Sequence, residues 1–170
     1  MANMVRKRFF ILLLVCSFLL TGCFSEHVSS RTVGKRAEEY MKCFADKDEE
    51  KLFSYFAEDI KTNRKELTMT EIKEAFNSVI DGNIVSYRYG GSGGGGESVD
   101  YGKIKKFYRS PEFYDVKTDT GKSYEIKFSY HHIWREYPER EGLREINIYQ
   151  TNDSGKEFLF RIVDNYDPDN

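Results

Sequence analysis

The sequence predicts an α+β fold in which three N-terminal helices pack against a curved antiparallel sheet of five to six strands, preceded by a lipoprotein signal peptide. Three observations support this prediction. Apolar residues recur at helical spacing up to about residue 80, they alternate at strand spacing from residue 84 onward, and an uncharged segment ending in a cysteine precedes both. A run of helices followed by a run of strands is typical of α+β domains.

The amino end has the order of an export signal. Basic residues at positions 6–8 are followed by twelve uncharged residues from Phe9 to Leu20 (FFILLLVCSFLL). A membrane-spanning helix needs about 20 apolar residues. Because this run is shorter, we expect it to be removed rather than retained, and the predicted signal peptide comprises residues 1–22.

The junction Leu20-Thr21-Gly22-Cys23 resembles the lipobox of bacterial lipoproteins. On this interpretation a signal peptidase recognises Leu20, Thr21 and Gly22, and the Cys23 thiol carries the lipid. Two or three acyl chains hold a protein stably at a membrane. We therefore expect a lipid-anchored protein that faces outward from the cell membrane, with residues 23–30 as a tether. The alternative is an ordinary secretory signal with a chance cysteine.

Composition constrains the chain after the signal peptide. The remaining 148 residues suffice for one domain, which we place at residues 31–163, before an acidic tail at 164–170. They contain 23 basic and 28 acidic residues, so no basic surface for nucleic acid is expected. With Cys23 acylated, Cys43 is the only thiol, which excludes an intramolecular disulfide; we expect its side chain to be half-buried and inert.

Helical periodicity appears three times. The first helix has one apolar face, formed by Val33, Ala37, Tyr40, Met41 and Phe44. Asp48 can cap a short second helix, whose apolar residues are Leu52, Phe53 and Phe56. Thr68 and Glu71 have the spacing of a capping box before a third helix, which is predicted to run through Ile80 and stop at Gly82.

Strand periodicity begins after Gly82. We expect strands at about 84–89, 98–109, 113–118, 122–134, 143–151 and 157–163. The glycine-rich segment 90–96 is predicted to be a flexible loop. Because it lacks the helix and lysine that follow a phosphate-binding loop, we expect no nucleotide there. Gly121 and Gly155 indicate tight turns between strands.

The strand at 122–134 is the most informative. Its alternation places Tyr124, Ile126, Phe128, Tyr130, His132 and Trp134 on one face. An aromatic face of this kind usually belongs to the core, but at the open end of a curved sheet it would line a ligand pocket. The candidate pocket residues are Tyr87, Phe128, Tyr130, His132 and Trp134.

Metal and cofactor signals are weak. Adjacent strand residues point to opposite faces, so His131 and His132 could share an ion only if the strand bulged there. The acidic tail lacks the glycine and glutamate of a calcium-binding EF-hand loop. The sequence predicts no metal and no cofactor.

Several segments resemble a known family. They are Lys47-Asp48 with Leu52-Phe53, the segment Ile80 to Tyr87 (IDGNIVSY), the segment Lys117 to Tyr124 (KTDTGKSY), and Glu141-Gly142-Leu143. Over about Thr32 to Val163 the chain resembles an uncharacterised lipoprotein family from Firmicutes, domain of unknown function number 5104. That family is similar in turn to the nuclear-transport-factor-2-like, cystatin-type cone fold.

The resemblance implies a curved sheet wrapped around a helix, with a cavity at its wide end. Enzymes on the cone fold, such as ketosteroid isomerases, hold an acid and a tyrosine inside that cavity. Acids on the predicted strands are Asp100, Asp115, Glu125 and Glu145. Glu125 lies opposite the aromatic face, and no motif gives any of them a catalytic role.

The expected function is therefore a non-enzymatic binding or interaction module whose ligand is a small molecule, a peptide or an envelope protein. One alternative is an enzyme of the isomerase or dehydratase type that uses a cavity acid or His132 with Tyr87 or Tyr130. An open cavity with such a pair in hydrogen-bond contact would favour it, and a cavity filled by aromatic rings would exclude it. A further alternative is an immunity-type lipoprotein that binds a protein partner.

Overall fold

The computed structural model describes residues 28–163. The predicted signal peptide, the predicted lipid-bearing Cys23, most of the tether and the acidic tail lie outside these residues. No helix in the described part of the chain is long and apolar enough to cross a membrane.

The helices come first, as predicted. They are α2 (Ser30–Ala45), α3 (Glu49–Ser54), α4 (Glu58–Asn63), α5 (Lys65–Glu74) and a π-helical segment (Ala75–Val79). The predicted apolar face of α2 is confirmed, because all five of its residues are buried. Asp48 accepts a hydrogen bond from the Lys51 backbone N–H and caps α3 as expected.

The prediction for the third helix was wrong at its start. Between residues 58 and 80 the chain forms two α-helices and the π-helical segment, and α5 begins at Lys65. Thr68 lies inside α5 with a fully buried side chain, so it cannot be an N-cap. Glu71 instead pairs with Arg64 at 3.0 Å and accepts the Val163 N–H at 2.8 Å. The predicted capping acid thus ties the helix to the end of the sheet.

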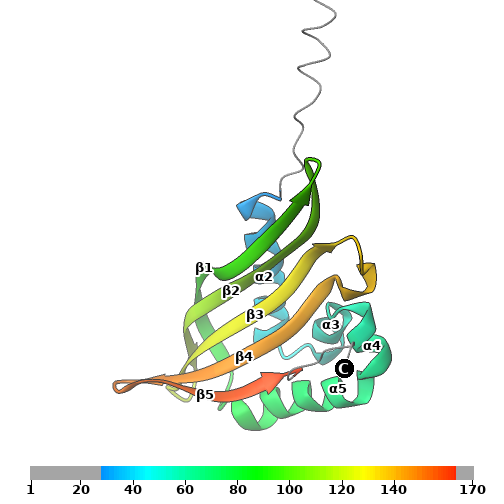
Figure 1. Cartoon of the computed structure of the whole chain (residues 1–170). Helices are drawn as coiled ribbons and strands as arrows, with labels where there is room; N and C mark the ends of the chain where they lie inside the picture. The colour runs from blue at the N-terminus through cyan, green and yellow to red at the C-terminus, as the bar shows by residue number, and fades with distance from the viewer. Residues whose placement is uncertain (1–27, 164–170) are drawn as a thin grey trace, which may run out of the picture.

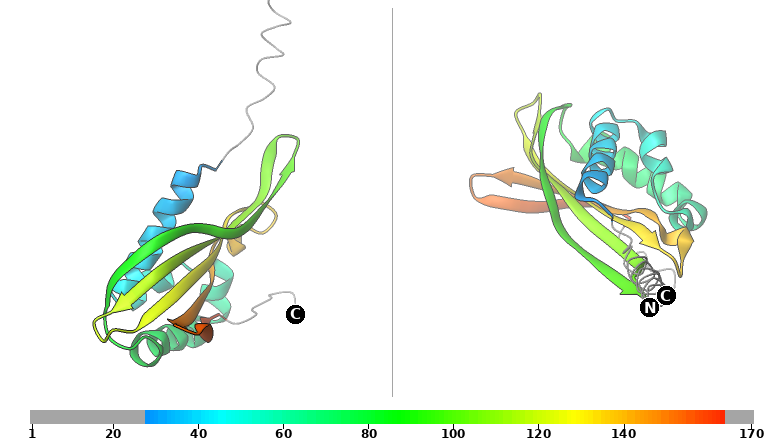
Figure 2. Two further views of the ribbon diagram at one scale, coloured as in Figure 1. Left: turned by 90° about the vertical axis from the view of Figure 1, so that its left-hand side faces the viewer. Right: turned by 90° about the horizontal axis from the view of Figure 1, so that it is seen from above.

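The sheet has five antiparallel strands in sequential order. They are β1 (Ile84–Asp100), β2 (Lys103–Thr118), β3 (Ser123–Trp134), β4 (Gly142–Asn152) and β5 (Gly155–Ile162). Figures 1 and 2 show an open, twisted sheet with the helices on one of its faces. The α+β class is therefore confirmed, with five strands.

The glycine-rich segment is part of a strand, which corrects the prediction of a loop. Gly90 to Gly96 belong to β1 and pair with β2, for example Gly96 with Tyr108 and Gly94 with Ser110. Side chains of β2 lie over four of these glycines, at positions 90, 93, 95 and 96; a Cβ added at Gly96 would sit 2.6 Å from the Tyr108 ring. Glycine suits these four positions because a neighbouring side chain fills the space that a Cβ would take.

One hydrophobic core joins the two layers. It extends from Val33 of α2 to Val163 after β5 and includes Phe44, Phe113 and Phe128. The Phe44 and Phe113 rings both meet the Phe128 ring edge-on, at 6.3 and 5.8 Å between centroids. Edge-to-face pairs add stabilisation beyond the area they bury. This core fixes α2 against the middle of β3.

Candidate functional site

A bulge in β3 shapes the site. On the β2 side, Phe107 pairs with Ile133 and Tyr108 with His131, so His132 is an extra residue in the ladder. A bulge turns side chains from their alternating directions. His131 and His132 consequently line the same cavity, although regular alternation would separate them.

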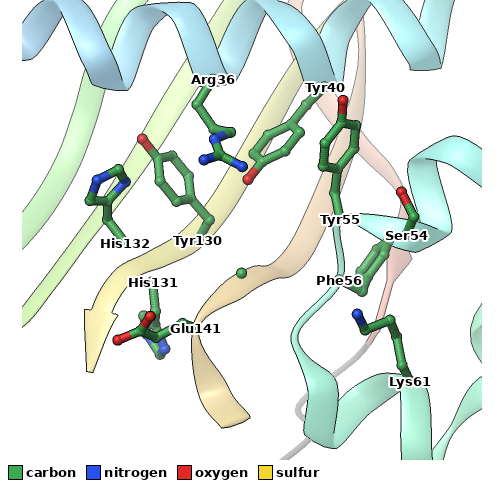
Figure 3. A pocket seen from close by; sticks show the side chains of 11 residues that line it. Arg36, Tyr40, Ser54, Tyr55, Phe56, Lys61, Tyr130, His131, His132 and Glu141 are labelled. Carbon is green, nitrogen blue, oxygen red and sulfur yellow. The ribbon is translucent and has the colours of Figure 1, made fainter. Parts of the chain in front are cut away.

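The cavity lies between α2, the α3–α4 region and the ends of β3 and β4 (Figure 3). Its volume is about 340 Å³, near the lower end of the usual size for small-molecule sites. The lining is mostly polar. It consists of Arg36, Tyr40, Ser54, Tyr55, Phe56, Lys61, Tyr130, His131, His132, Glu141 and Gly142.

Two buried polar atoms of the lining have no hydrogen-bond partner among the described residues. They are the Tyr130 hydroxyl and Nδ1 of His131. The other ring nitrogen of His131 bonds to the Arg140 backbone. That bond leaves Nδ1 as an acceptor in the neutral ring. The cavity therefore offers one hydroxyl, able to donate or accept, and one ring acceptor.

Burial controls the protonation of these groups. Desolvation raises the pKa of Tyr130 to about 12, and nearby Tyr89 adds to the effect. Desolvation, with Arg144 and Lys106 nearby, lowers the pKa of His131 to about 4. The pKa of His132 is also lowered, first by burial and then by Arg36. Near neutral pH both imidazoles and the phenol are therefore uncharged.

Charge in the cavity comes from the side chains around its mouth. Lys61 pairs with Glu58 at 2.9 Å, and a Glu141 carboxylate oxygen accepts the Trp134 backbone N–H at 2.7 Å. Arg36 forms no ion pair with any residue in the described part of the chain. Figure 3 shows its guanidinium between the rings of Tyr130 and Tyr40. Arg36 is thus the uncommitted cation of the site.

The structure separates the predicted pocket residues. Tyr130 and His132 line the cavity, whereas Phe128 is fully buried in the core. The Tyr87 ring packs against Phe113 at 5.6 Å, away from the lining. The Trp134 ring packs at 4.5 Å from His131 and at 3.5 Å from the Lys106 ammonium, without lining the cavity.

Sequence reasoning missed Arg36, Tyr40 and Glu141 as lining residues. Tyr40 was assigned to the core face of the first helix, which is correct for most of its ring, since the side chain is only 2% exposed. Arg36 precedes the buried Ala37 and looked like any solvated helix residue. Only the packing of α2 across the open end of β3 places it over the cavity.

The rest of the molecule offers two further observations. A second cavity of about 670 Å³ lies between the start of α2 and the β1–β2 hairpin, and Val28, the first described residue, lines it. Within residues 28–163 no three His, Cys, Asp or Glu side chains come together in a way that could hold a metal ion.

Fold and site together define an α+β domain with an open antiparallel sheet and a small polar cavity at one end. The chain belongs to the family described as a domain of unknown function (DUF5104), whose model matches residues 39–151. This match confirms the family that the sequence resemblance indicated. A search of curated proteins found no match.

Proposed function

We propose that this protein is a lipid-anchored, extracytoplasmic binding module that takes a small carboxylate-bearing ligand in the cavity beside Tyr130. The export signal and Cys23 support the anchor, and the cone-type resemblance supports a domain that carries a cavity at its wide end. The polar lining favours a polar ligand over an apolar one.

The observation that carries the proposal is the buried Tyr130 hydroxyl, which has no hydrogen-bond partner within residues 28–163. A buried polar group left unsatisfied costs about 1–3 kcal/mol, and buried polar atoms in native proteins are nearly always paired. Tyr130 is 1% exposed, so bulk water does not satisfy its hydroxyl. An acceptor atom supplied by a ligand would satisfy the hydroxyl.

Arg36 indicates the chemical class of that ligand. Its charge acts on the ionisation of Tyr40, Tyr130 and His132, so it lies near all three. An uncommitted guanidinium beside a hydroxyl donor suits a carboxylate. The His131 Nδ1 acceptor adds a place for a hydroxyl or amine on the same molecule.

The test is a titration of the full chain with a panel of small carboxylates, namely lactate, benzoate and glutamate, followed by isothermal calorimetry and NMR shift mapping. For any probe that binds, Arg36→Gln should lower the affinity about tenfold or more, because a charge-assisted hydrogen bond is lost. Tyr130→Phe should weaken it by about fivefold.

Lys35→Gln is the matched control. It removes the same charge from the neighbouring position on α2, and Lys35 does not line the cavity. Binding should be unchanged in this variant. If no carboxylate shifts the resonances of the cavity, or if Lys35→Gln and Arg36→Gln act alike, the proposed ligand class is wrong.

The enzymatic alternative receives less support. The cavity is open and is not filled by aromatic rings, and an enzyme would need such an open cavity. The Tyr130 hydroxyl, however, has no hydrogen bond to a described histidine or carboxylate, and the Tyr130 and His132 ring centroids are 6.1 Å apart. A base and a tyrosine in contact are therefore not assembled here.

The anchor has its own test. Cys23→Ser should release the protein from membranes into the medium or periplasm and abolish labelling by radioactive palmitate. Membrane-bound, lipid-labelled Cys23→Ser protein would contradict the lipobox interpretation.

A further inference from the structure

The tip of the β1–β2 hairpin carries an aromatic residue that the fold does not use. Asp100 pairs with Lys103, so Tyr101 and Gly102 form a two-residue turn. The backbone φ of Tyr101 is +47°, a conformation that turns usually assign to Asn, Asp or Gly. Its side chain is 98% exposed. A bulky ring is thus held in an unfavourable conformation with no contact inside the domain to compensate.

Apolar and basic side chains accompany this ring. Val99 is also exposed, at 52%. Residues 97–109 contain four basic residues, Arg109 included, and two acidic ones, whereas the whole chain has more acidic than basic residues. Lys105 pairs with Asp100 at 2.7 Å, and Lys103 forms no ion pair with a described residue. The tip therefore combines an amphipathic aromatic ring with excess positive charge.

The position of the tip matches the position of the proposed anchor. Val28 lines the second cavity together with Phe107 and Arg109, and Arg109 pairs with Gly95. Tyr101 lies six residues beyond Gly95, which is about 20 Å along a strand. Cys23 lies five residues before Val28, a reach of at most about 18 Å. Figure 1 shows the hairpin tip and the start of α2 at the same end of the domain.

We propose that the tip of the β1–β2 hairpin docks on the bilayer beside the lipid anchor, with Tyr101 and Val99 in the headgroup region and Lys103 near anionic lipid phosphates. Tyrosine favours the membrane interface because one end of the ring is apolar and the other polar, and basic residues are attracted to anionic leaflets. This inference rests on the proposed anchor. The second contact would fix the orientation of the domain on the membrane.

The experiment uses the full chain, produced with its signal peptide, purified in its lipidated form and reconstituted into vesicles. In the Val99→Cys variant, the introduced cysteine is labelled with an environment-sensitive fluorophore, and Tyr101 is left in place. Ser154→Cys, in the β4–β5 turn, is the matched control. Cys43 is buried and burial raises the pKa of its thiol, so the label goes to the introduced cysteine.

In vesicles of phosphatidylethanolamine and phosphatidylglycerol, the Val99 label should become about threefold brighter and blue-shifted relative to phosphatidylcholine vesicles, because an anionic surface attracts the basic tip. The Ser154 label should stay at its value in water. In the Tyr101→Asn variant, whose asparagine suits the turn better, the fluorescence of the Val99 label should return to its value in water.

A Val99 label that responds no more than the Ser154 label, on protein whose mass shows acylation at Cys23, would overturn the docking of the tip and leave the anchor intact. Protein without acylation would overturn the anchor and the docking together. A Val99 label already shielded without vesicles, in a protein that sediments as a dimer, would instead assign the tip to self-association and overturn the proposal.

Discussion

The two halves of β3 have the same sequence pattern and opposite environments. In the first half Tyr124, Ile126 and Phe128 are at most 2% exposed and close-packed. In the second half the strand bulges, and from His131 to Trp134 every side chain is partly exposed. Tyr130 lies at the boundary between them, with a buried ring and a hydroxyl that faces the cavity.

The difference shows how one strand can serve both stability and binding. In the first half, rings of α2 and β2 pack on Phe128, so apolar contacts dominate there. At the second half, α4 is held to β4 by an ion pair between Asp59 and Arg144, whose side chains are only 5% and 12% exposed. Polar contacts of this kind hold the helices to the sheet beside the cavity and leave the cavity open. Four substitutions test this contrast.

The largest effect is expected from Phe128→Ala in the closed half. The fully buried ring contacts Tyr40, Phe44 and Phe113. Its removal should lower the free energy of unfolding by about 3–5 kcal/mol, measured by urea denaturation. Trp134→Ala, in the open half, should cost less than about 2 kcal/mol. Equal losses would mean that the two halves are packed alike.

Asp59→Asn should lower the free energy of unfolding by roughly 2 kcal/mol. Arg144 would lose its buried counter-charge, while the amide keeps one acceptor oxygen. Asp115→Asn is the matched control. Asp115 pairs with Arg88 at 2.9 Å, but both side chains are more than 60% exposed, so the loss should stay below about 0.5 kcal/mol. An Asp59→Asn variant as stable as Asp115→Asn would contradict a structural role for the buried pair.

His131 should make stability depend on pH. Its pKa is lowered from 6.5 to about 4 in the folded state, so below pH 6.5 the unfolded chain binds a proton that the folded chain does not. Stability should therefore fall as pH decreases through this window. Between about pH 7.5 and about pH 5, the free energy of unfolding of the natural protein should fall about 1–2 kcal/mol further than that of His131→Gln. Parallel pH profiles would contradict the burial of His131.

Tyr130→Phe should produce the smallest change, and one of opposite sign. Removing this buried hydroxyl, which has no partner in the described part of the chain, should raise the free energy of unfolding by up to about 1 kcal/mol in the ligand-free protein. Tyr124→Phe is the comparison, because the Tyr124 hydroxyl accepts the Asp81 backbone N–H at 3.0 Å. The free energy of unfolding of Tyr124→Phe should be about 1 kcal/mol lower than that of the natural protein. Losses in both would mean that the Tyr130 hydroxyl is already satisfied.

The candidate site was only partly predictable. Alternation along β3 placed Tyr130 and His132 on one face, and the structure has both in the cavity lining. Alternation does not tell which residues of a face border a cavity, so Phe128 and Trp134 were grouped with them. The bulge at His132 depends on the register with β2, and the position of Arg36 depends on the packing of α2. Neither leaves a local signal in the sequence.

By itself the sequence determined the α+β order, the apolar face of α2, the Asp48 cap and the turns at Gly121 and Gly155, whose φ angles are indeed positive. These features depend on neighbours within a few residues. Tertiary structure decided the rest. The glycine-rich segment became a strand because its backbone pairs with β2. The cavity formed where α2, the α3–α4 region and the ends of β3 and β4 meet. Both outcomes depend on residues far apart in the chain.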